Sequence, residues 1–166
     1  SGASITGAYD DAGACLLGGM VLSDNSKFRL LKHTHVPRSL GEVVVIRLPE
    51  KETKYTSSVD TKRYSSFRIE SMKAFEYAKR GEVVKAMLLN SIIQCAALGY
   101  SLEPVSSAID GGATASGISG KGPAVAAFCQ THAIASSIEK RWRKEAVSPI
   151  MIIKTRVVQP ERLVKN

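Results

Sequence analysis

The chain has 166 residues, 44% of them hydrophobic, which is enough apolar material for the core of one ordinary domain. No apolar run approaches the ~20 residues that a membrane span needs. Residues 1–24 hold no Lys or Arg, so we also expect no signal peptide. The formal net charge of +8 comes from dispersed basic residues without interleaved aromatic residues, which argues against nucleic-acid binding.

The first predicted element is a short helix that begins near Asp10 and Asp11 and ends at Gly18, because acidic residues favour helix N-termini and glycine favours C-termini. Two short strands around a polar turn predict a hairpin over residues 20–31. The three cysteines stand singly in apolar sequence, so we expect buried free thiols in a reducing cytoplasm and no structural zinc site. These cysteines are Cys15, Cys95 and Cys129.

The middle of the chain predicts a strand followed by helices. Residues 42–48 form the strongest strand of the sequence, and the polar residues 50–58 predict a loop. Helices are expected over residues 67–80, 82–98 and 101–110. The second of them is apolar nearly all round, which predicts a central, covered helix.

Two strands near residues 113–118 and 123–129, a helix that starts at Thr131 and a strand over 150–155 complete the chain. From residue 42 onward the order is strand, helices, strand, strand, helix, strand. This is the split βαβ order of an α+β, ferredoxin-like sandwich, with extra helices in the first crossover.

A glycine-rich motif, residues 117–123 (GISGKGP), lies between two of the predicted strands. Its glycines allow left-handed φ values, so successive N–H groups can line a hollow of anion size. Ser119 adds a hydroxyl and Lys121 a charge that could reach a phosphate or a carboxylate. The same residues would suit a simple turn between two buried strands, and the motif alone leaves both readings open.

Residues 7–19 (GAYDDAGACLLGG) resemble the aspartate-containing segment of the GHMP kinases, the superfamily of galacto-, homoserine, mevalonate and phosphomevalonate kinases. The motif at 117–123 resembles the third, glycine-rich motif of that superfamily, whose C-terminal domain has a ferredoxin-like fold. The paired aspartates, the turn over 23–25 and the sequence 119–123 look most like the archaeal-type shikimate kinases.

This resemblance implies a cytoplasmic kinase that uses ATP and Mg²⁺ to phosphorylate shikimate, a small-molecule substrate of aromatic amino acid biosynthesis. It implies that Asp11 takes the proton of the acceptor hydroxyl. Asp10 would meet Mg²⁺ or a substrate hydroxyl, and Arg63 would bind the shikimate carboxylate with its planar fork. The residues alone also suit a helix N-cap at Asp11, and a solvated helix-start residue remains an open alternative for Arg63. The residues expected at the nucleotide are Gly117, Ser119, Gly120, Lys121 and Gly122.

The nucleotide loop of these kinases, Pro-x-x-x-Gly-Leu-x-Ser-Ser-Ser, is not found in the sequence. We therefore expect residues 1–33 to end an N-terminal kinase domain and residues 34–166 to form the C-terminal domain, with the N-terminal half as the missing partner. The chain alone should then be inactive, and its uncovered apolar surface should favour self-association. A homoserine or mevalonate-type kinase and a non-catalytic ferredoxin-like binding module remain alternatives.

Overall fold

The computed structural model describes residues 9–50 and 61–160 and divides the chain into two compact units. Unit 1 comprises residues 1–38 and 157–166, and unit 2 comprises residues 39–156. The predicted loop over 50–58 lies outside the described residues apart from Glu50, and so does the start of the aspartate motif at residues 7 and 8. None of the described helices combines the length and the apolar character that a membrane crossing requires.

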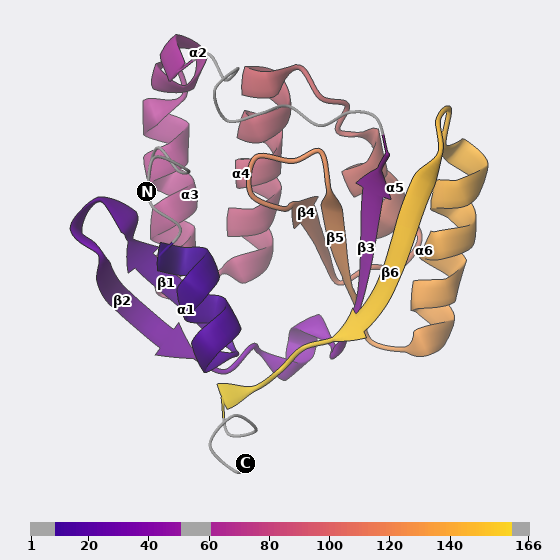
Figure 1. The fold of residues 1–166 in the computed structure, drawn as a ribbon, viewed down its shortest axis with the longest axis horizontal. Helices are drawn as coiled ribbons and strands as arrows, with labels where there is room; N and C mark the ends of the chain where they lie inside the picture. The colour runs from indigo at the N-terminus through magenta and orange to yellow at the C-terminus, as the bar shows by residue number, and fades with distance from the viewer. Residues whose placement is uncertain (1–8, 51–60, 161–166) are drawn as a thin grey trace. The chain divides into compact units, whose positions relative to one another are not determined.

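Unit 1 contains the predicted short helix and the predicted hairpin (Figure 1). Gly19 joins them with a positive φ of 67°, and a Cβ at this position would lie 2.5 Å from the backbone oxygen of Thr34. Only glycine therefore fits between the helix and the strand that passes it. The elements are helix α1 (Tyr9–Leu17), the antiparallel strands β1 (Met20–Asp24) and β2 (Arg29–Thr34), and the 3₁₀ turn η1 (Asn25–Lys27). A second 3₁₀ turn, η2 (Arg38–Leu40), spans the boundary to unit 2.

Unit 2 is built on a four-stranded sheet in the order β4-β5-β3-β6, in which all neighbours are antiparallel. Helices separate the first strand from the second and the third from the fourth, so the predicted ferredoxin-like fold is confirmed. The strands are β3 (Val43–Pro49), β4 (Ala115–Ile118), β5 (Val125–Cys129) and β6 (Ile150–Arg156). The helices are α2 (Thr61–Ser65), α3 (Arg68–Arg80), α4 (Val83–Leu98), α5 (Glu103–Asp110) and α6 (His132–Glu145).

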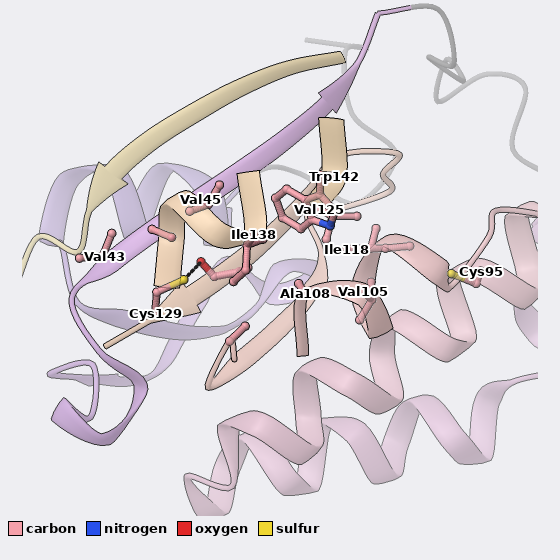
Figure 2. Packing of buried hydrophobic residues seen from close by; sticks show 13 residues of the cluster. Val43, Val45, Cys95, Val105, Ala108, Ile118, Val125, Cys129, Ile138 and Trp142 are labelled. Carbon is pink, nitrogen blue, oxygen red and sulfur yellow. Dashed lines mark hydrogen bonds between the residues drawn. The ribbon is translucent and has the colours of Figure 1, made fainter. Parts of the chain in front are cut away.

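The core of unit 2 lies between one face of the sheet and helices α4, α5 and α6 (Figure 2). Alternate residues of β3 and β5 point into it, as expected for strands with one covered face. Ile138 and Trp142 of α6 lie one turn apart on the helix, and both are buried there. The Thr131 side chain caps this helix by accepting from the Ile134 N–H at 3.2 Å.

Two predictions about burial are wrong. Helix α4 is not covered all round, because it packs chiefly against α3 and β4 and leaves a third side open. A row of apolar residues on that side remains 42–45% exposed: Val84, Leu88 and Ile92. Of the cysteines, Cys95 and Cys129 are buried but Cys15 is exposed, since none of the residues of α1 is buried.

Candidate functional site

The two aspartates expected to carry chemistry occupy the first turn of α1, and both are exposed. Acidic side chains suit this position because the helix dipole is positive at its N-terminus. Asp10 Oδ1 accepts a hydrogen bond from Asn25 Nδ2 at 2.8 Å. The Asp11 side chain makes no hydrogen bond within the described part of the chain. The neighbouring carboxylates therefore differ, because one is held by the hairpin and the other is open to a ligand.

The hairpin turn that holds Asp10 is itself fixed by side chains. Asn25 Oδ1 accepts from the Ser23 hydroxyl at 2.7 Å, and Asp24 Oδ1 accepts from the Ser26 hydroxyl at 2.6 Å. The Ser26 hydrogen bond, helped by the Lys27 N–H and charge, lowers the pKa of the Asp24 carboxyl. The turn thus presents Asn25 to α1 in one defined orientation.

The glycine motif forms the connection between β4 and β5. Two backbone bonds of 2.9 Å close it, from Ser119 N to Ala124 O and from Gly122 N to Ser119 O. Gly120 has a φ of 56°, and a Cβ built on it would meet open space. Its N–H has no partner among the residues that the structure describes. An exposed backbone amide beside the Ser119 hydroxyl and the half-buried Lys121 has the chemistry to bind a phosphate oxygen.

The other two glycines of the motif are closely packed. A Cβ on Gly117 would lie 3.0 Å from Ser91 Oγ of α4. A Cβ on Gly122, whose φ is 71°, would lie 3.0 Å from both Ile118 Cγ2 and Tyr100 Cε2. The motif therefore combines two tightly packed ends with an open centre.

Arg63 is exposed on α2, in the same unit as the glycine motif. Its neighbour Tyr64 hydrogen-bonds Gln94 of α4. Burial, together with the nearby Tyr100, raises the pKa of the Tyr64 hydroxyl. Because Tyr100 also packs against Gly122, a short series of side chains runs from α2 to the glycine motif.

Within unit 1 the structure brings Asp10 and Asp11 together with Asn25. Within unit 2 it brings the glycine motif together with Ser91 and Tyr100. The sequence analysis did not assign a role to Asn25, Ser91 or Tyr100. A serine inside the apolar helix α4 was a signal that could have identified Ser91. Across the described ranges, no cluster of three or more His, Cys, Asp or Glu side chains is placed to hold a metal ion.

The chain has relatives of known function. It is 39% identical over 142 residues to the shikimate kinase of Methanocella arvoryzae, an alignment that covers 85% of this chain and 47% of that protein. The shikimate kinase of Pyrococcus furiosus is 36% identical over 87% of this chain and 50% of its own length. The chain is a relative of the archaeal shikimate kinases. It spans about half the length of the curated relatives it matches, and no protein-family model matches it.

The fold is also found among solved structures. The homoserine kinase of Cytophaga hutchinsonii shares it with a TM-score of 0.59 at 22% identity, over 89% of this chain and 51% of that one. The expected fold class is therefore confirmed, since the chain shares its fold with about half of a homoserine kinase. At this identity the likeness concerns the fold alone.

Proposed function

We propose that this chain is the C-terminal part of a shikimate kinase, which transfers the γ-phosphoryl group of ATP to the 3-hydroxyl of shikimate. The observation that carries the proposal is the 39% identity to an archaeal shikimate kinase over 85% of the chain. That alignment is long enough to need residues of both units, and each unit holds one of the two chemical motifs.

Asp11 is the base of the proposed reaction. As the shikimate oxygen attacks the γ-phosphorus, the hydroxyl proton passes to the Asp11 carboxylate, the bond to the β-phosphate oxygen breaks, and ADP leaves. The exposed position of Asp11 and the absence of a hydrogen bond to it in the described part of unit 1 support this role. Asp10 is then a substrate-side or Mg²⁺-side residue, or one that orients the helix.

The glycine motif is proposed to hold the ATP phosphates. Its fit rests on the open space at Gly120, the left-handed φ of Gly120 and Gly122, and the hydroxyl and ammonium groups of Ser119 and Lys121. Bound Mg²⁺ would neutralise phosphate charge during transfer. This ion usually takes most of its ligands from phosphates and water, so it requires no cage of protein carboxylates. Gly117 supports the motif from within β4.

Arg63 is proposed to bind the shikimate carboxylate. It is exposed and therefore accessible, and guanidinium groups bind carboxylates in a bidentate manner. The rest of the nucleotide site belongs to the missing N-terminal half. Three cysteines without a disulfide agree with a cytoplasmic location.

The proposal is tested with the complete kinase, meaning this chain joined to the missing half, either its own or that of the Methanocella relative. Coupled ADP release is measured with shikimate, homoserine and mevalonate. We expect turnover with shikimate only, and none by residues 1–166 alone. Turnover with homoserine or mevalonate in preference to shikimate would assign a different substrate. Robust turnover by the chain alone would show that no second half is needed.

A further inference from the structure

Ser91 links helix α4 to the strand that leads into the glycine motif. Its side chain is completely buried. The hydroxyl donates to the backbone oxygen of Met87 at 2.7 Å and accepts from the backbone N–H of Ile118 at 2.9 Å. One hydroxyl thus donates a hydrogen bond to its own helix and accepts one from β4.

The bond to Ile118 matters because β4 is an edge strand of the sheet. The outward N–H groups of an edge strand have no neighbouring strand to pair with. Ser91 supplies the partner for Ile118, the last residue of β4. The next residue, Ser119, begins the exposed turn. The bond therefore fixes the point at which the strand ends and the turn begins.

Gly117 makes this bond possible. A Cβ on Gly117 would lie 3.0 Å from Ser91 Oγ, 3.3 Å from Met87 Cε and 3.4 Å from the Met87 oxygen. Contacts of this length are tighter than ordinary packing, so a side chain at this position would require Ser91 or Met87 to shift. The absent side chain lets β4 approach α4 closely enough for the serine to reach the Ile118 N–H.

We propose that Ser91 is a positioning residue for the phosphates of ATP, an inference that rests on the proposed function of the glycine motif. By holding the backbone of Ile118, it fixes the position of Ser119 and the direction of the Gly120 N–H. Ser91 does not contact the nucleotide. It acts through the backbone of β4, so its loss displaces the groups that bind ATP and leaves shikimate binding unaffected.

The chain offers a matched control on the same strand. Ser116 of β4 is also buried, with 2% of its surface exposed. Its hydroxyl has no hydrogen-bond partner among the described residues. Ser91→Ala and Ser116→Ala therefore delete the same atom from two buried serines, of which only the first holds the motif.

The test is steady-state kinetics of the complete kinase with each variant, at a temperature well below its melting transition. For Ser91→Ala we expect kcat/KM for ATP to fall about 10-fold or more, since small displacements of binding groups have effects of this size. The KM for shikimate should stay within about 2-fold of the parent, and Ser116→Ala should leave both parameters unchanged. Ser91→Cys replaces the hydroxyl with a slightly larger thiol that keeps only a weak hydrogen bond, and it should give an intermediate ATP defect.

An active parent whose ATP kinetics survive Ser91→Ala would overturn the inference about Ser91 and leave the proposed function intact. Equal losses in Ser91→Ala and Ser116→Ala would also overturn it, because the effect would then be one of packing. If Ser91→Ala does not fold, the folded Ser91→Cys variant decides in the same way. A parent with no activity on shikimate would overturn both proposals.

Discussion

The side-chain amide of Asn25 donates to Asp10 Oδ1 over 2.8 Å, which joins the hairpin turn to the first turn of α1. Asn25 is itself oriented by the Ser23 hydroxyl. This relationship separates the roles of two adjacent aspartates. We expect Asp10 to orient the helix start and Asp11 to perform the chemistry.

An exchange of the two side chains tests this division of roles. Asp10→Asn alone loses the charge-assisted acceptor, and Asn25→Asp alone places two carboxylates together, so each should lower kcat of the complete kinase about 10-fold. In the double variant Asp10→Asn/Asn25→Asp, the charge-assisted hydrogen bond between the two side chains forms again with donor and acceptor exchanged. The Ser23 hydroxyl can still donate to residue 25. Steady-state kinetics should therefore show kcat recovering to within a few-fold of the parent.

The opposite result has a clear meaning. If Asp10 binds Mg²⁺ or substrate with its own charge, restoring the hydrogen bond cannot replace that charge. The double variant would then be as impaired as Asp10→Asn alone, and the positioning role of Asp10 would be rejected.

The contact between Gly117 and Ser91 predicts coupled effects on stability. Gly117→Ala should destabilise the chain by about 1–3 kcal/mol, because its Cβ would meet Ser91 Oγ at 3.0 Å. Ser91→Ala should cost about 1–3 kcal/mol by leaving the Ile118 N–H unpaired. In the double variant the removed hydroxyl makes room for the added methyl group, so the loss should be smaller than the sum of the two. Urea unfolding measures all three, and strict additivity would contradict the packing described here.

The cysteines predict a graded reaction with thiol reagents. Burial raises the pKa of Cys129 to about 11 and also raises the pKa of Cys95. Both stay protonated and shielded at pH 8, whereas Cys15 is exposed. Mass spectrometry after brief alkylation should find one modified residue, Cys15, and full modification only in denaturant. Rapid labelling of Cys129 in the folded chain would contradict its burial.

The raised pKa of Cys129 also sets a direction for stability at alkaline pH. Above the ordinary thiol pKa of about 8.5 the unfolded chain releases this proton while the folded chain keeps it. The contribution of Cys129 to the free energy of unfolding is therefore fully present below about pH 8.5 and is lost as pH rises toward about 11. Unfolding of a Cys129→Ala variant should show a weaker decline over this range than the parent shows.

The exposed apolar row on α4 predicts self-association of the chain alone. Leu88 and Ile92 lie one turn apart and are each more than 40% exposed. Apolar surface of this kind favours contact with another molecule. Sedimentation at tens of micromolar, roughly the range in which weak association appears, should show species heavier than the monomer. Leu88→Gln/Ile92→Gln should shift them toward monomer, and a parent that is monomeric throughout would contradict the prediction.

Much of the fold follows from local pattern. Thr131 at the start of the last predicted helix and the order of strands around the glycine motif predicted α6 and the ferredoxin-like sheet. Amphipathic periodicity and turn residues are local signals, and they survive into the folded chain.

The errors and omissions concern burial and hydrogen bonds that depend on tertiary contacts. Helix α4 is apolar nearly all round, yet its burial depends on which elements surround it, and the sequence pattern does not reveal them. The Asn25–Asp10 bond joins side chains 15 residues apart, and the Ser91–Ile118 bond joins groups 27 apart. Neither spacing has a repeating pattern, so composition and periodicity could not reveal them.

The most direct test of the account is the turnover of the complete kinase carrying Asp11→Asn. We expect kcat with ATP and shikimate to fall by about 10²–10⁴-fold, because the acceptor hydroxyl loses its base. The melting temperature should stay close to that of the parent, since the Asp11 side chain makes no hydrogen bond within the described residues. A folded Asp11→Asn enzyme with the turnover of the parent would contradict the assignment of Asp11 and the mechanism built on it.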